Sequence, residues 1–195
     1  MREVREGLTA ITSAVLAEHP QSRVSFAEYA GGGIKTLDFT SDGAKVTKAI
    51  ERTVESQRAT SMIVDRLIET GKDMQKSKAP RRAIVIISLG SPDAGQTQPA
   101  EAVAPVQKSG ASVWAVSVGI TPAMAEPLVE NLPKMTGGKR TAMVGPSGLV
   151  AAMTRIGQSL TSQYQVTFTA GDTLSKNVQA GARRGDEVLR SMIIR

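Results

Sequence analysis

Two short apolar segments, each followed by a stretch with helical signals, constrain the fold of this chain most strongly. Residues 83–88 (AIVIIS) and 112–119 (SVWAVSVG) are apolar at nearly every position. Strands of this composition are typical of parallel sheets, which are covered by helices on both faces. Such strands alternating with helices, joined by right-handed crossovers, predict an α/β fold with a doubly wound, mostly parallel sheet in three layers.

The segments around these two strands complete the pattern. Residues 23–30 and 34–39 alternate as strands and are joined by three glycines, which predicts a hairpin. Spacing and capping signals predict the other elements. The first three helices are expected at 2–18, after a cap at Thr40 or Ser41, and around Ile63 to Met74. The next three are expected from Pro99 to about Lys108, after Thr121-Pro122, and after a cap at Ser147. A short strand is expected at 140–145.

The pattern changes after Tyr164. Residues 165–171 and 177–185 read as strands without a helix between them, and 188–194 reads as a third strand or a tail. We therefore predict two parts, an α/β domain over 1–163 and a C-terminal β extension over 164–195.

Composition narrows the functional classes. Hydrophobic residues make up 41% of the 195 residues, which is enough for a core, and the absence of cysteine excludes disulfides, thiolate metal sites and cysteine nucleophiles. No run of roughly 18 apolar residues occurs, so we expect no membrane insertion. The first residues, MREVREGLTA, are too polar for a signal peptide, so the chain as given is expected to be cytoplasmic.

The net charge of +6 and the pI of about 9.8 permit contact with nucleic acid, but the charges are spread along the chain. The densest cluster, Arg183-Arg184, is followed closely by Asp186 and Glu187, and aromatic residues for base stacking make up only 3%. We expect no nucleic-acid partner. Binding through the basic surface stays an alternative, which a steep loss of affinity with salt would support.

Motifs for catalysis are absent from the sequence. The only histidine, His19, precedes Pro20 at an expected helix end, and no Gly-x-Ser-x-Gly segment occurs. The segment PKMTGGKR fails as a phosphate loop because Pro133 takes the first glycine position and Arg140 follows Lys139. We expect no enzyme activity. The alternative is a nucleotide- or metal-dependent enzyme on the doubly wound fold.

The order of these elements resembles a von Willebrand factor type A (VWA) domain. The hairpin RVSFAEYA…IKTLDF, the loop and helix RATSMIVDRL (58–67), the strand IVIISLGS, and MTGGKRTAM (135–143) carry the resemblance. SLTSQYQVTF (159–168) and ARRGDEV (182–188) further resemble a bacterial subgroup, the VWFA-related Acidobacterial domain. The resemblance covers nearly the whole chain, and it implies a module that binds another protein.

The resemblance also implies a metal-ion-dependent site, of which this chain has an incomplete form. Family members hold a divalent cation with an Asp-x-Ser-x-Ser motif after the first strand, a threonine from a second loop and the aspartate of Thr-Asp-Gly. Here the first strand and its motif are absent, and Leu89 replaces the aspartate. Thr60 or Ser61 matches the threonine, and aligning Asp65 with the family helix favours Ser61. Without a fixed carboxylate, hydroxyl groups hold Mg²⁺ poorly.

We therefore expect a non-catalytic, adhesion-type module that binds a protein partner through the strand-end loops. The expected contact residues are Thr60, Ser61, Ser88, Gly90, Ser91 and Asp93, with the turn at 119–121. No cofactor and no metal are expected. The residual metal-ligand candidates are Thr60, Ser61, Ser88 and Asp93, with Mg²⁺ expected only if a missing N-terminal segment is restored.

The missing first strand has a structural consequence, because it lies in the middle of the sheet in VWA domains. Its loss leaves the strands near 23–30 and 83–88 facing an unpaired gap, and each buried unpaired amide costs about 1–3 kcal/mol. Either the flanking strands close on each other, or the protein begins upstream of Met1. We favour the second, in which case a signal peptide in the upstream segment would make the protein exported.

Overall fold

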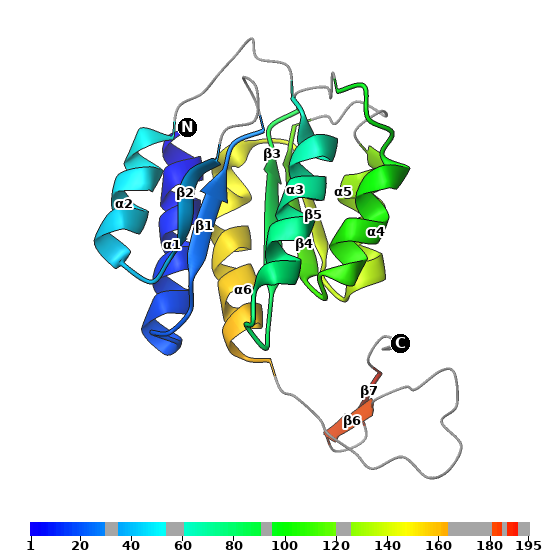
Figure 1. Cartoon of the computed structure of the whole chain (residues 1–195). Coiled ribbons are helices and arrows are strands. Elements are labelled where there is room, and N and C mark those ends of the chain that lie inside the picture. The colour runs from blue at the N-terminus through cyan, green and yellow to red at the C-terminus, as the bar shows by residue number, and fades with distance from the viewer. Residues whose placement is uncertain are drawn as a thin grey trace. The chain divides into compact units, whose positions relative to one another are not determined.

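A parallel sheet of three strands organises residues 1–163 in the computed structural model (Figure 1). Strands β3 (Ala83–Ser88), β4 (Ser112–Val118) and β5 (Arg140–Met143) follow one another in the order β3-β4-β5. In register, Ser88 lies opposite Ser117 and Val118 opposite Met143. The two apolar segments expected to form buried parallel strands thus pair with each other.

The structure describes residues 1–29, 35–53, 61–90, 95–119, 126–163, 181–184 and 187–190. It divides the chain into two compact units, Met1–Gln163 and Tyr164–Arg195. The expected glycine turn, the strand at 165–171 and the start at Thr121-Pro122 lie outside the described residues.

Helices cover both faces of the sheet, as the sequence predicts. One core joins the sheet to α3 (Ile63–Lys76), α4 (Ala100–Lys108) and α5 (Glu126–Thr136). The other joins it to α1 (Arg2–Glu18) and α6 (Leu149–Thr161). Side chains of a strand point alternately to the two faces, so Ile84 and Ile86 enter the first core while Val85 and Ile87 pack against the second. The fold is a three-layer α/β arrangement. None of the helices described is long and apolar enough to cross a membrane.

The predicted hairpin forms a separate sheet. Strands β1 (Val24–Ala27) and β2 (Lys35–Thr40) pair antiparallel with each other, and no pairing joins β1 to β3 among the described residues. In Figure 1, helix α6 is visible behind the space between β1 and β3. The flanking strands therefore do not close on each other.

Two predicted helix caps are wrong. Helix α2 (Gly43–Arg52) begins after Asp42, whose carboxylate accepts hydrogen bonds from the main-chain nitrogens of Ala44 and Lys45 at 3.0 and 3.2 Å. Thr40, one of the two predicted caps, instead accepts from the Asp42 nitrogen at 3.1 Å. Asp42 caps because its carboxylate reaches the free N–H groups of the first turn.

The cap predicted at Ser147 is also replaced. Ser147 lies in a 3₁₀ turn, η1 (Pro146–Gly148), and α6 begins after Gly148, which has no side chain to form a cap. Pro146 restrains the backbone at the start of this turn. The α-helix therefore begins at Leu149, two residues after the predicted cap.

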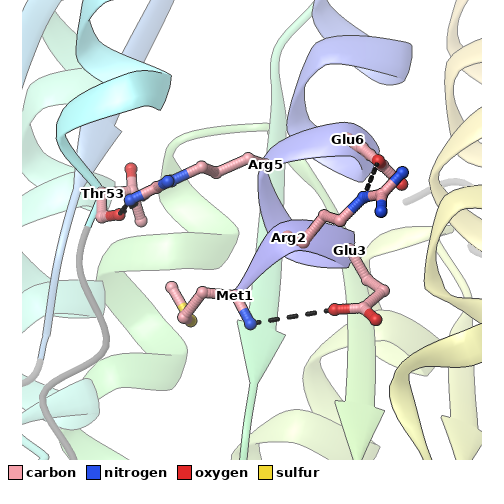
Figure 2. Close-up of polar contacts among 6 residues, drawn as sticks. All are labelled: Met1, Arg2, Glu3, Arg5, Glu6 and Thr53. Atoms are coloured by element: carbon pink, nitrogen blue, oxygen red, sulfur yellow. Dashed lines mark hydrogen bonds and ion pairs between the residues drawn. The ribbon is translucent and has the colours of Figure 1, made fainter.

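Helix α1 is joined to the end of α2 by Arg5 (Figure 2). The Arg5 Nε and Nη2 atoms donate to the main-chain oxygen of Thr53 at 3.1 and 2.7 Å. Thr53 is the C-terminal cap of α2, where carbonyl groups lack partners within the helix. Nearby, Arg2 donates to Glu6 at 2.7 Å, and this hydrogen bond raises the pKa of the Arg2 guanidinium. The guanidinium of Arg5 thus satisfies a helix end and fixes two helices to each other.

The smaller unit contains a short hairpin. Strands β6 (Gly181–Arg184) and β7 (Glu187–Arg190) pair antiparallel, with Ala182 opposite Leu189. β6 lies within the segment 177–185, where the sequence predicts a strand, and β7 begins at Glu187 and overlaps 188–194, which reads as a third strand or a tail.

Candidate functional site

Serine side chains lie at the carboxyl ends of two neighbouring strands. Ser88 ends β3 and lies opposite Ser117 of β4. Ser88 shares a face with Ile86, and Ser117 shares a face with Ala115, and both of these apolar residues belong to the core under α3, α4 and α5. Ser88 is 4% exposed and Ser117 is 1% exposed. Two hydroxyl groups therefore lie side by side and buried at the carboxyl ends of the strands, which is where ligands bind in open α/β folds.

A third buried serine precedes α3. Ser61 is fully buried, and its Oγ forms no hydrogen bond with the residues that the structure describes. The same holds for Oγ of Ser117. A buried hydroxyl without a partner costs about 1–3 kcal/mol. These two groups are therefore available to a ligand, a water or a neighbouring loop.

Tyr29 connects the segments that carry these serines. Its main-chain oxygen accepts a hydrogen bond from the Met62 nitrogen at 2.7 Å. Its phenolic hydroxyl donates to the main-chain oxygen of Ile87 at 2.6 Å. Met62 and Ile87 are the chain neighbours of Ser61 and Ser88. The segment after β1 thus holds the start of α3 at the end of β3, which brings Ser61 and Ser88 to the same end of the sheet.

A carboxylate lies in the first turn of α3. Asp65 accepts a short hydrogen bond from the hydroxyl of Thr97, which belongs to the segment between β3 and α4. This contact fixes the segment after β3 to α3. The carboxylate of Asp65 is thus already engaged by one hydrogen-bond donor.

The expected contact residues fall into two groups. Ser61 and Ser88 are buried at this end, and Gly90 follows with a φ of 84°, a left-handed conformation that favours glycine. Leu89, which lies between Ser88 and Gly90 in the sequence, is 43% exposed. In the expected 119–121 turn only Gly119 is described, with a φ of 87°. Thr60, Ser91 and Asp93 lie outside the described residues.

The described ligands do not fit the cation site that the fold family implies. The described oxygen atoms at this end belong mainly to neutral hydroxyls, with the carboxylate of Asp65 bound by Thr97. The side chain of Leu89 has no oxygen atom, at the position where the resemblance implies an aspartate. No group of three or more His, Cys, Asp or Glu residues that could hold a metal occurs in the described part of the chain. Mg²⁺ prefers an octahedral set that includes anionic oxygens.

The sequence alone does not identify Ser117 and Thr97 as members of the site, and it indicates no role for Tyr29. Ser117 had a usable signal, because Ser88 and Ser117 are polar residues near the ends of otherwise apolar strands. Tyr29 and Thr97 had none, because their partners lie 58 and 32 residues away along the chain.

Comparison with solved structures identifies the fold. The conserved hypothetical protein BatB from Bacteroides thetaiotaomicron aligns with a TM-score of 0.61 and 18% identity, over 80% of this chain and 85% of that chain. An aerotolerance-related membrane protein from Bacteroides fragilis aligns with a TM-score of 0.60 and 17% identity, over 82% and 89%.

A von Willebrand factor type A protein from Catenulispora acidiphila aligns with a TM-score of 0.60 and 14% identity, over 80% of this chain and 37% of that chain. No protein-family model matches the sequence, and a search of curated proteins finds no match. The likeness therefore concerns the three-dimensional arrangement of the elements. This chain has the α/β fold of von Willebrand factor type A domains.

Proposed function

We propose that this chain is a non-catalytic, protein-binding module of the VWA type that contacts its partner through the carboxyl ends of β3 and β4, without a bridging cation. The observation that carries the proposal is the gathering of the buried Ser61, Ser88 and Ser117 at the carboxyl end of the sheet, where the exposed Leu89 directly follows Ser88. Loops held on a rigid scaffold are the usual place for binding residues.

Leu89 gives this end of the sheet a surface that suits a protein partner. Its side chain is 43% exposed between a buried serine and a glycine with positive φ. An apolar group at this position can be buried by a partner, whereas the aspartate of the family would bind a cation. The predicted contacts at Thr60, Ser91 and Asp93 would add polar groups around it.

The position of the only histidine supports a binding role over a hydrolytic one. His19 caps the C-terminal end of α1, and its Nε2 lies 3.4 Å from Nη2 of Arg81. Arg81 precedes the first residue of β3, whereas Ser88 is the last. The imidazole therefore lies at the opposite end of β3 from the buried serines, too far to act as a base for a serine nucleophile.

The test places a photo-crosslinking amino acid at Leu89 and, as the control, at the exposed Lys108. Lys108 ends α4, which leads into the start of β4, so it reports on the opposite end of the sheet. We expect a protein adduct from position 89, unchanged by EDTA, and none from position 108. Adducts from position 108 alone would contradict the proposed contact face.

Calorimetric titration with Mg²⁺ and Mn²⁺ tests the absence of a bridging cation separately. We expect no stoichiometric binding to the purified chain. Stoichiometric binding that is abolished in Ser61→Ala would show that the site holds a metal and would overturn this part of the proposal.

A further inference from the structure

A cavity of about 400 Å³ is lined by residues of α6, β4 and β5. Its apolar part is formed by Trp114 of β4 and by Ala152 and Ile156 of α6, all of which are buried. Trp114 is the third residue of β4, and Lys139, which also lines the cavity, directly precedes β5, so the cavity lies toward the amino ends of these strands. Ligand sites in proteins occupy roughly 300–1,000 Å³, so this cavity is large enough for a small molecule.

Lys139 lines the cavity because side chains alternate between the two faces of a strand. Arg140, the next residue, turns to the face covered by α5, where its Nη1 lies 3.3 Å from a carboxylate oxygen of Glu130. Lys139 and Thr141 therefore share the opposite face, which is the one covered by α6, and both line the cavity. No carboxylate pairs with the ammonium group of Lys139 among the described residues.

Helix α6 brings a second cation to the same cavity. Ala152, Arg155, Ile156 and Ser159 are spaced three and four residues apart, so they lie along one face of the helix, and all four line the cavity. In the part of the chain that the structure describes, the guanidinium of Arg155 has no carboxylate partner, and no acidic residue lines the cavity. Two positive charges without a counter-charge thus lie at its rim.

The indole of Trp114 offers an apolar surface rather than a hydrogen-bond donor. Its Nε1–H already donates to Oγ of Ser112, two residues earlier on the same face of β4, at 3.1 Å. The remaining atoms of the indole are apolar and suit contact with a flat ring. Gln158 and Ser162 add neutral hydrogen-bonding groups to the lining. The cavity thus combines an apolar floor with a positively charged rim.

We propose that this cavity binds a small organic anion that carries an apolar ring. The ring packs against Trp114, Ala152 and Ile156, and the anionic group accepts charge-assisted hydrogen bonds from Lys139 and Arg155, which suit a carboxylate or a phosphate. The site lies toward the amino ends of β4 and β5, away from the proposed protein-binding face, and does not depend on that function. With the strand order β3-β4-β5, it also lies on the far side of the sheet from the edge of β3.

The test follows the indole N–H signal in NMR spectra of the whole chain while 2-naphthoate or 2-naphthyl phosphate is added. Trp114 is the only tryptophan in the sequence, so the chain gives a single signal of this kind. We expect a saturable shift with both anions. The neutral 2-naphthamide lacks the charge and should bind at least about tenfold more weakly than 2-naphthoate. Acetate and inorganic phosphate lack the ring and should also bind at least about tenfold more weakly than the naphthyl anions.

Charge-removing variants test the two cations. Lys139→Gln and Arg155→Gln alter exposed side chains, so both variants should fold as the parent does, which thermal unfolding checks. Each should weaken the binding of 2-naphthoate at least about threefold, and the double variant about tenfold, because each loses one exposed charge pair with the ligand. The weak binding of 2-naphthamide should not change. Lys48→Gln removes the same charge from an exposed position on α2 and is the matched control.

Three results would overturn the proposal. The first is the absence of a saturable shift of the indole signal at millimolar 2-naphthoate. The second is equal affinity for 2-naphthoate and 2-naphthamide, which would mean that the cations do not select the ligand. The third is an equal loss of affinity in Lys48→Gln and in Lys139→Gln, which would mean that only the overall charge of the chain matters. Leu89→Glu, which targets the proposed contact face, should leave the binding of 2-naphthoate unchanged.

Discussion

The hydroxyl of Tyr29 donates a hydrogen bond of 2.6 Å to the main-chain oxygen of Ile87, the last but one residue of β3. This contact joins the segment after β1 to a strand with which β1 does not pair. It also satisfies a main-chain carbonyl group near the carboxyl end of β3. The position of the candidate site relative to the hairpin thus depends strongly on one side chain.

Replacing Tyr29 with phenylalanine removes this hydroxyl and leaves the oxygen of Ile87 unpaired. We expect Tyr29→Phe to lower the free energy of unfolding by about 1–2 kcal/mol, measured by urea denaturation. Thr36→Val removes an exposed hydroxyl whose contact with the main-chain oxygen of Phe26 is longer, at 3.4 Å, and serves as the control, with an expected change below about 0.5 kcal/mol. Equal stability of the Tyr29 variant and the parent would show that the hydrogen bond does not contribute.

Gly71 allows α3 and α4 to approach closely. A Cβ atom at this position would lie 2.8 Å from the main-chain carbon of Pro105 and 2.9 Å from its oxygen. Because backbone atoms cannot move aside easily, we expect Gly71→Ala to destabilise the chain by at least about 2 kcal/mol in urea denaturation.

Gly43, in the first turn of α2, is the matched control for Gly71. A Cβ atom there meets nothing within 4 Å. Gly43→Ala should be neutral or stabilising by up to about 1 kcal/mol, because alanine restricts the unfolded chain more than glycine does. Similar losses of stability in both variants would mean that the close approach at Gly71 is not the cause.

The hydroxyl of Ser117, which has no hydrogen-bond partner among the described residues, should be dispensable for folding. Removal of a buried polar group without a partner relieves a desolvation cost, so we expect Ser117→Ala to be neutral or stabilising by about 1 kcal/mol. In contrast, Ser109 donates to the Val106 oxygen at 2.5 Å and accepts from the Ala111 nitrogen at 3.1 Å. Ser109→Ala should therefore destabilise by about 1–2 kcal/mol. A clear loss of thermal stability in Ser117→Ala would reveal a partner for its hydroxyl.

The hydrogen bonds of Arg5 to Thr53 should contribute more to stability than the exposed ion pair of Arg2 and Glu6, although both arginines belong to α1 (Figure 2). Arg5→Ala removes a charged donor from a part-buried helix end, and we expect a loss of about 1–2 kcal/mol in urea denaturation. Arg2→Ala removes an exposed ion pair and should leave the urea denaturation midpoint essentially unchanged. The reverse order would show that α1 is not fixed through Arg5.

Several features of the candidate site could be read from the sequence. The resemblance to VWA domains implies Ser61 and Ser88 as site residues, and the hydrogen bonds of Tyr29 bring both to the same end of the sheet. The sequence does not single out Asp42 as the cap, because three adjacent residues, Thr40 to Asp42, can all act as caps, and only the backbone path decides among them. The engagement of Asp65 by Thr97 also required the structure, because the residues belong to different elements.

The sequence by itself determined which segments are strands and helices and which strands are buried on both faces, because burial leaves a periodic pattern in the side chains. Tertiary structure decided the rest. Gly138 reads as an ordinary helix terminator, yet a Cβ atom there would lie 1.8 Å from the main-chain oxygen of Val113. That approach and the hydrogen bond from Tyr29 to Ile87 both involve main-chain atoms distant in sequence. Main-chain atoms are the same in nearly every residue, so their pairing leaves little trace in the order of amino acids.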